Sequence, residues 1–461
     1  MSYTIIYIIL ISLFIFSFEY KMDKERKQLI DDTIDSLMKE ARLKNVGLII
    51  TNLTSTLHQK IYGDTDKINV ETPFIIGSVS KSFTALSILK LNISLNQTLD
   101  KFDLGDYIDE KFAKKTTISE LLNHTSGLAK FTSQDIGTKG NFSYSNYGYS
   151  LLGKIIEKVS KKKYSEYIQE KIFTPLQMNN SYAIYDKSIV DSYDNFLGFT
   201  TKYTSLKSEI GDGFNVPGGY ISVSMQDMGQ YLRFYLDPKN EEYISQITSE
   251  SVKTGYNSYY GMGMEIAKND FYTLYAHNGA TVTFLCNLYI YPKLELAFFI
   301  VTNSVDYVCS SNAYNLFISV QNLIVYGSLD KINGSSFFSN YFTLDVIILL
   351  IIALPLTYLI ITIVRIIKRK KYLWFIGVKG KIILGVDIVV LIIFPLILII
   401  YFYADPNMYY LHFIKEILFC LFMFCSCLMV NFLLKLIYVF VYKKYFEKKN
   451  NNEEMEINLM E

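Results

Sequence analysis

Apolar residues recur near the start of the chain in two different periods, and each period predicts a different element. Residues 22–45 carry apolar side chains at helical spacing, which indicates a helix. These side chains are Leu29, Ile30, Ile34, Leu37 and Met38. The next segments, VGLIITN (46–52) and TLHQKIYG (56–63), are short and separated by a turn, which is typical of two strands.

Strand-like patterning returns only after a long helical block. Residues 85–235 are typical of helices and loops, and a last helix is predicted over residues 311–327. Between them, residues 259–303 hold segments rich in aromatic and β-branched side chains, broken by Gly, Asn and Pro. We therefore expect an α/β (α+β) domain whose sheet is built from both ends of this region, with a helical insertion between them.

Longer apolar runs lie at the two ends of the chain. Residues 3–18 carry no charge but are shorter than the roughly 20 residues that a membrane crossing needs. We therefore interpret residues 1–20 as a signal peptide or an uncleaved N-terminal anchor, and both readings stay open. Near the other end, three apolar runs approach membrane length and predict transmembrane helices. They cover residues 343–367, 382–403 and 411–441.

The charges around these runs predict an orientation. Residues 368–381 are basic, and the tail, residues 442–461, begins with a basic segment, whereas the connection between the second and third runs has no Lys or Arg. Because basic loops stay in the cytoplasm, the loop and the tail are expected there. Residues 21–335 would then form an extracytoplasmic domain on the outer face of a cell membrane, held in lipid by the three helices.

Charge and composition give no support for nucleic-acid, metal or nucleotide binding. The net charge of +1 gives no support for nucleic-acid binding. No metal-binding spacing and no nucleotide-binding loop is present, so no metal and no cofactor are expected. Cys286 and Cys309 both belong to the predicted outer domain, and a disulfide between them is left open.

Three short motifs carry candidate chemistry. In FIIGSVSKSFTAL, Ser78 and Lys81 lie three residues apart at the start of an apolar helix, where burial and the helix dipole disfavour an ammonium. A lysine that is partly neutral can take a hydroxyl proton and so activate a serine. Tyr144 and Asn146 precede a second helix, and a tyrosine beside a cation can carry protons.

Histidine supplies the third motif. His277, Asn278 and Gly279 lie in a strand-like segment, where glycine allows a ligand to approach the backbone. His124 is the other histidine that could belong to the site. It ends a helix whose carbonyl dipole suits an imidazolium, so we interpret it as structural. Each motif alone has an ordinary structural explanation as a cap, an aromatic or a core residue.

Together, S-x-x-K, Y-x-N and H-x-G occur in an order that resembles the serine β-lactamase and penicillin-binding protein superfamily. The resemblance is nearest to the class C β-lactamase-like branch, which includes D,D-peptidases and esterases. It covers about residues 25–325 and includes ISELLNHTSGL, TPLQM and VPGGYISVSMQDM. It implies an antiparallel sheet flanked by helices, with a helical subdomain.

The resemblance also implies roles for single residues. Ser78 would be the acylated nucleophile, and Lys81 its base or the partner of that base. Tyr144 would pass the proton to the leaving group, and Asn146 would hold Lys81 and the substrate amide. Substrate binding would fall to His277, Asn278 and Gly279, and the backbone N–H of Ala280 would complete an oxyanion hole with that of Ser78.

One departure from the superfamily pattern affects the substrate. Many relatives have K-T-G where this chain has His277-Asn278-Gly279. A histidine is mostly neutral at pH 7, so recognition of a substrate carboxylate would be weaker. We therefore expect a D,D-peptidase-like or esterase-like serine hydrolase that acts on a small-molecule or peptide substrate of the cell envelope. The alternatives are a β-lactamase, or a penicillin-binding sensor or immunity protein that is acylated without efficient turnover.

Overall fold

The computed structural model divides the chain into two compact units, residues 1–337 and 338–461. It describes these residues: 22–133, 138–196, 199–249, 251–268, 272–305, 310–328, 337–367, 422–438 and 440–441. The predicted N-terminal segment, the basic loop, the second apolar run and the polar tail lie outside them, as does Cys309. Cys286 is a free, buried thiol.

An antiparallel sheet of eight strands organises the first unit, in the order β2-β1-β13-β12-β11-β10-β9-β8. The two ends of the domain therefore meet where β1 pairs with β13, as the sequence pattern predicts. The strands are β1 Val46–Asn52, β2 Thr56–Tyr62, β8 Val252–Gly255, β9 Ser258–Gly261, β10 Met264–Lys268, β11 Thr273–Ala280, β12 Leu285–Tyr291 and β13 Leu296–Thr302.

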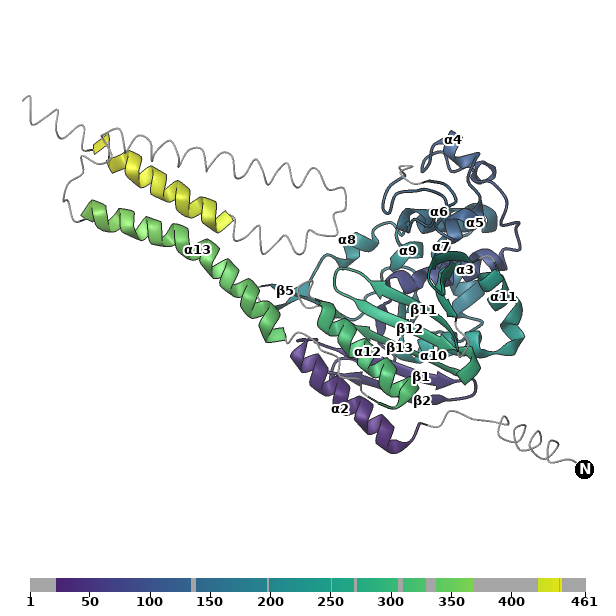
Figure 1. Cartoon of the computed structure of the whole chain (residues 1–461). Helices are drawn as coiled ribbons and strands as arrows, with labels where there is room; N and C mark the ends of the chain where they lie inside the picture. The colour runs from purple at the N-terminus through teal and green to yellow at the C-terminus, as the bar shows by residue number, and fades with distance from the viewer. Residues whose placement is uncertain are drawn as a thin grey trace, which may run out of the picture. The chain divides into compact units, whose positions relative to one another are not determined.

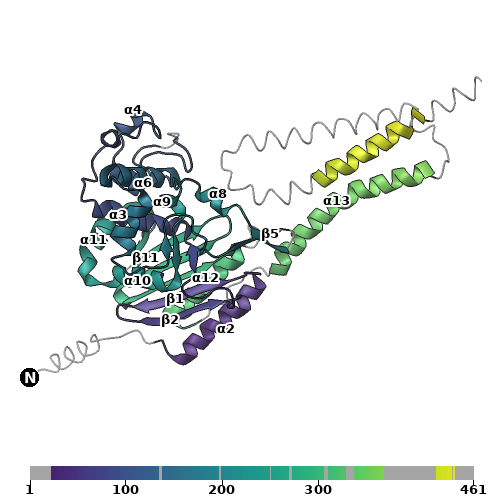
Figure 2. The same ribbon diagram turned by 180° about the vertical axis from the view of Figure 1, so that it is seen from behind.

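Helices cover both faces of this sheet (Figure 1). On one face, α2 and α12 pack together over the side chains of Leu48 and Ile50, which alternate along β1 with Ile49 on the other face. The opposite face carries α10 and the helical block that contains α3 and α6, seen from behind in Figure 2. Because both faces are covered, β1, β12 and β13 are buried along their whole length.

The helices of the first unit follow the predicted order. They are α2 Lys24–Glu40, α3 Ser80–Lys90, α4 Glu110–Ala113, α5 Ile118–Leu122, α6 Asn146–Ser160, α7 Tyr164–Ile168, α8 Leu206–Ile210, α9 Val216–Gly219, α10 Met225–Leu236, α11 Glu241–Ser249 and α12 Ser310–Tyr326. α2 begins after Asp23, whose side chain accepts the Arg26 N–H, and it buries Ile30, Ile34 and Met38 at the predicted spacing.

The helical block also contains short strands that the sequence pattern does not predict. Four of them, β4 Ser181–Tyr182, β5 Ser192–Phe196, β6 Phe199–Tyr203 and β7 Ser222–Ser224, fall within residues 85–235. β3 Pro73–Ile75 pairs with β7, and this small sheet leads the chain into the Ser78 segment. Strands of two or three residues, such as β4 and β7, are too short to show a period of two.

The second unit is described only in part. α13 Phe337–Ile367 includes the first predicted membrane run, and residues 422–438 form a helix within the third. Among the residues with described positions, no helix has the length and apolar character needed to cross a membrane. The predicted bundle of three transmembrane helices is therefore not supported by this part of the chain.

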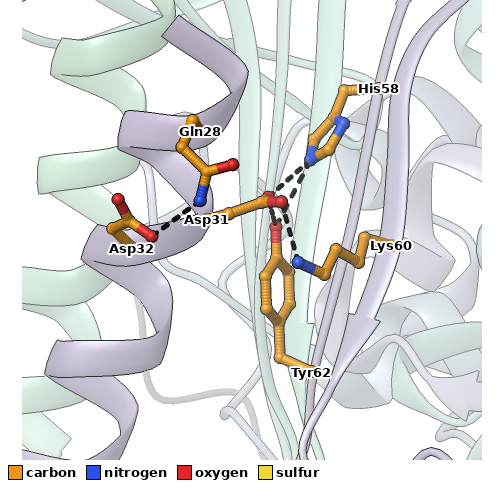
Figure 3. Close-up of polar contacts among 6 residues, drawn as sticks. All are labelled: Gln28, Asp31, Asp32, His58, Lys60 and Tyr62. Atoms are coloured by element: carbon orange, nitrogen blue, oxygen red, sulfur yellow. Dashed lines mark hydrogen bonds and ion pairs between the residues drawn. The ribbon is translucent and has the colours of Figure 1, made fainter. Parts of the chain in front are cut away.

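A polar cluster attaches α2 to the edge strand β2 (Figure 3). Asp31 on α2 accepts hydrogen bonds from His58 Nε2 at 2.8 Å, Lys60 Nζ at 2.7 Å and Tyr62 Oη at 2.5 Å, all from β2. Burial alone would raise the pKa of Asp31, but the bonds from Lys60, Tyr62 and His58 outweigh it and hold that pKa below its usual value.

Asp31→Asn should lower the free energy of unfolding of the full-length chain by about 1–2 kcal/mol at pH 7, because charge-assisted bonds are lost. Since the folded-state pKa of Asp31 lies below the unfolded value, this stabilisation is present above about pH 4 and disappears as the pH falls through the folded pKa. Urea denaturation followed by circular dichroism at several pH values measures the difference.

Asp32→Asn is the matched control for this prediction. Asp32 is the next residue on α2, and its carboxylate accepts an exposed bond from Gln28 Nε2 (Figure 3). Its replacement should change the free energy of unfolding by less than about 0.5 kcal/mol. Equal losses in the two variants would contradict a specific attachment through Asp31.

Candidate active site

Ser78 lies at the one break in a long buried stretch of the first unit. Every residue from 73 to 88 is buried except Ser78, which is partly exposed. It belongs to a single 3-10 turn, Gly77–Val79, that leads directly into α3. The apolar residues on either side anchor this turn in the core, so the hydroxyl is held in place where a substrate can reach it.

Lys81 follows in the first turn of α3, and its side chain is completely buried. Its Nζ lies 3.0 Å from Ser78 Oγ, 2.6 Å from Asn146 Oδ1 and 2.5 Å from the carbonyl oxygen of Gly218. Among the residues with described contacts, no carboxylate forms an ion pair with this amine. Its partners are therefore neutral oxygens.

This environment favours the neutral amine. Burial, together with the positive charge of Lys130, holds the pKa of Lys81 well below its usual value. A neutral amine has two N–H donors and one lone pair. The carbonyl oxygens of Asn146 and Gly218 can only accept, so they take the two N–H groups. The lone pair is then left facing the hydroxyl of Ser78.

Two other elements supply these acceptors. Asn146 is the first residue of α6, whose N-cap is Ser145; the Ser145 hydroxyl accepts the Gly148 N–H at 3.1 Å. Gly218 lies in the short helix α9, which is fastened to α3 by the bond from Thr84 Oγ1 to Pro217 O at 2.8 Å. Three segments far apart in the sequence therefore converge on one amine.

Tyr144 reaches the same amine with its ring. Lys81 Nζ lies 4.7 Å from the centroid of the Tyr144 ring and 5.5 Å from that of Tyr149. The Tyr144 ring centroid also lies 6.4 Å from that of His277. The structure therefore brings the S-x-x-K, Y-x-N and H-x-G motifs to one place.

Two glycines let β11 approach the serine turn. Gly77 has a φ of +50°, and a β-carbon there would lie 2.4 Å from the backbone nitrogen of Ala280. A β-carbon at Gly279 would lie 2.2 Å from Ile76 O and 2.4 Å from Cys286 Sγ. Any side chain at either position would separate β11 from Ser78. The backbone of Ala280 is thereby held next to the turn that carries the nucleophile candidate.

His277 on β11 is buried and neutral. Its Nδ1 donates to Asn278 O at 2.7 Å, so its Nε2 is the acceptor for Tyr260 Oη at 3.2 Å. Burial is the main cause that lowers the pKa of His277 to about 3. His277 therefore supplies no positive charge at neutral pH. Asn278 and Ala280, by contrast, are exposed.

Two neighbours were not assigned to the site from the sequence. Tyr260 bonds His277, and its ring centroid lies 4.8 Å from that of His124, which lies 4.3 Å from that of Tyr144. The sequence suggested an imidazolium at His124, and this is wrong. Burial is the main cause that holds the pKa of His124 well below its usual value.

One hydrogen bond defines the tautomer and the structural role of His124. Its Nδ1 accepts the Ser145 N–H at 3.1 Å, which fixes the hydrogen on Nε2, a buried atom without a partner in the described structure. The helix dipole that was expected to favour a cation acts weakly beside the cost of burying a charge. His124 thus packs under Tyr144 and holds the start of α6.

Gly279→Ala should lower the free energy of unfolding by about 1–3 kcal/mol, because the new methyl group overlaps Ile76 O and Cys286 Sγ. It should also slow the labelling of Ser78 by a fluorophosphonate probe. Gly105→Ala is the control, since a β-carbon there meets no atom within 4 Å. Unchanged stability and labelling in Gly279→Ala would contradict the close approach of β11.

Comparison with known proteins points to one family. A family model described as Beta-lactamase matches residues 30–316. Among solved structures, an octameric penicillin-binding protein homologue from Pyrococcus abyssi superimposes with a TM-score of 0.53 and 25% sequence identity. That match covers 63% of this chain and 77% of the homologue.

Curated relatives match over a smaller share of their length. Protein flp of Staphylococcus aureus (strain MW2) is 26% identical over 257 residues, which are 48% of this chain and 51% of that protein. Beta-lactamase-like protein 4 of Dictyostelium discoideum is 26% identical over 347 residues, 62% of this chain and 60% of that protein. This chain therefore spans about half to three fifths of the length of these relatives.

Proposed function

Because the chain belongs to the β-lactamase family, whose members are usually serine hydrolases, we propose that it hydrolyses a peptide, amide or ester through an acyl-enzyme on Ser78. The observation that carries this proposal is the contact of Lys81 Nζ with Ser78 Oγ and two neutral carbonyl oxygens. This arrangement leaves a basic lone pair directed at a hydroxyl that solvent can reach.

In the proposed reaction, the Lys81 amine accepts the Ser78 proton while Oγ attacks the substrate carbonyl carbon. The negative charge that develops on the carbonyl oxygen is stabilised by the backbone N–H groups of Ser78 and Ala280. Tyr144, whose ring lies beside Lys81 Nζ, delivers a proton to the leaving group. Water then attacks the acyl carbon and gives its proton to the Tyr144 oxygen, while Lys81 returns a proton to Ser78 Oγ as the acyl group leaves.

Asn146 and the H-x-G segment position the substrate in this proposal. The Asn146 side-chain oxygen is occupied by Lys81, so its amide nitrogen is the group that can donate to a substrate carbonyl. Gly279 lets β11 lie against the serine turn, and the next residue back on the strand, Asn278, is exposed to solvent. Asn278 is therefore the residue of this segment that would contact the substrate from solvent.

The neutral state of His277 favours a substrate without a carboxylate at that position. A carboxylate buried beside an uncharged imidazole loses hydration without gaining an ion pair. Penicillins and D-Ala-D-Ala peptides carry such a carboxylate. We therefore propose an esterase-like or amidase-like activity in preference to β-lactamase activity.

We further propose that the hydrolase domain lies outside the cell and is attached to the membrane through its C-terminal segments. The support is the apolar surface of α13, where large side chains are widely exposed to solvent. Leu349, Leu354 and Ile367 are 64%, 68% and 71% exposed. Many large apolar side chains exposed along one helix are rarely left in water. The basic residues between 365 and 381 agree with a cytoplasmic loop.

A fluorophosphonate probe tests the acyl-enzyme chemistry on the full-length chain. Labelling should occur on Ser78 and vanish in Ser78→Ala, and Lys81→Ala should slow it by about 100-fold or more. Because Lys81 acts in its neutral form, the labelling rate should rise with pH through its lowered pKa and be constant above it, well below pH 10.

Lys90→Ala is the matched control, since Lys90 lies at the other end of α3 and packs on the Tyr243 ring. It should label at close to the wild-type rate. Labelling of Lys81→Ala at the wild-type rate would remove Lys81 from the mechanism. No labelling of Ser78 and no ester hydrolysis in the wild type would refute the proposed function.

Protease added to intact cells should cleave within residues 21–335 if the domain is extracytoplasmic. A tag placed after Glu461 should stay protected until the membrane is permeabilised, because the tail is proposed to lie in the cytoplasm. A cytosolic marker protein controls for lysis. Protection of residues 21–335 in intact cells would overturn the proposed location.

A further inference from the structure

A cavity of about 390 Å³ lies next to the Tyr144 ring, between that tyrosine and strands β9, β10 and β11. Tyr144 and Tyr260 are shared between the cavity and the candidate active site, because Tyr144 contacts Lys81 and Tyr260 bonds His277. The cavity therefore adjoins the site at the residue proposed to protonate the leaving group.

Aromatic rings and one carboxylate distinguish the lining of this cavity. Phe142, Tyr144, Tyr259 and Tyr260 contribute rings, and Glu265 on β10 contributes the carboxylate. Ring faces attract cations through the aromatic quadrupole, and a carboxylate attracts them through its charge. The other lining residues are small or aliphatic, with two hydroxyls, and none is a lysine or an arginine.

Glu265 has no compensating cation in the part of the chain that the structure describes. Lys253 and Lys268 lie on β8 and β10, but neither lines the cavity. The Glu265 side chain is exposed to solvent on β10, and partial desolvation by the surrounding protein raises its pKa. A carboxylate held this way gains stabilisation when a positive group enters the cavity.

The register of the sheet explains why these groups face one another. Glu265 pairs with Tyr260 on one side and with Ala276 on the other, so the three side chains form one row across β9, β10 and β11. The small side chain of Ala276 leaves room beside the carboxylate. Glu265 is therefore placed by the sheet itself, next to a ring that contacts His277.

We propose that this cavity binds a positively charged ammonium group on the leaving-group side of the substrate, with Glu265 as the specificity-determining residue. The inference rests on the proposed hydrolase function and names a substrate class for it: cationic esters, thioesters or amides. A quaternary ammonium suits the site best, because it has apolar methyl groups for the rings and a charge for the carboxylate.

A pair of isosteric thioesters tests the proposal with the full-length chain. Acetylthiocholine carries a trimethylammonium group, and S-(3,3-dimethylbutyl) thioacetate carries a neutral group of the same shape. Wild-type kcat/KM should be about tenfold higher for the cationic thioester. Glu265→Gln should remove most of this preference, because it should lower kcat/KM for the cationic thioester far more than for the neutral one. Glu71→Gln, at an exposed position outside the cavity lining, should behave like the wild type.

A second measurement needs no turnover. Phenyltrimethylammonium should slow fluorophosphonate labelling of Ser78 in the wild type and in Glu71→Gln, but much less in Glu265→Gln. Equal substrate preference and equal slowing in wild type and Glu265→Gln would overturn the ammonium site. Failure of the wild type to hydrolyse acetylthiocholine while Ser78 is still labelled would overturn the ammonium site alone. Failure of Ser78 to label at all would overturn the hydrolase function as well.

Discussion

The burial of one amine among neutral oxygens is the interaction on which the site depends. Placing Lys81 in the core carries a desolvation cost that an ordinary ion pair would reduce, yet its described partners are Ser78, Asn146 and the Gly218 carbonyl. A carboxylate in their place would hold the amine in its charged form. Neutral acceptors satisfy its N–H groups without restoring the charge, which keeps the lone pair available.

Much of the surrounding fold serves to bring those acceptors together. α3 supplies the serine and the lysine, α6 supplies Asn146, and α9 supplies a backbone carbonyl. β11 closes the fourth side, where Gly77 and Gly279 allow its backbone to reach the serine turn. The arrangement is held by packing in a buried core, so small changes in volume at these contacts should be transmitted to the site.

The charges around the site then differ from one region to the next, so the regions should favour substrate groups of different charge. His277 and His124 are neutral mainly because burial disfavours an imidazolium. Beyond Tyr144 and Tyr260, Glu265 gives the adjoining cavity a negative charge. An anionic substrate group therefore gains little binding energy at β11. A cationic group in the cavity is attracted by both the carboxylate and the aromatic rings.

The sequence by itself determined the order of elements, both segments of the sheet, the family resemblance and the residues of the three motifs, because periodicity and local motifs are readable along one chain. Only the tertiary structure decided the Gly218 carbonyl as an acceptor of Lys81, the neutral state of His124 and the cavity beside Glu265. These depend on contacts between residues as far apart as 81 and 218, and on how far each group is removed from water. Local sequence records neither the partner nor the burial, so a dipole argument at His124 gave the wrong charge.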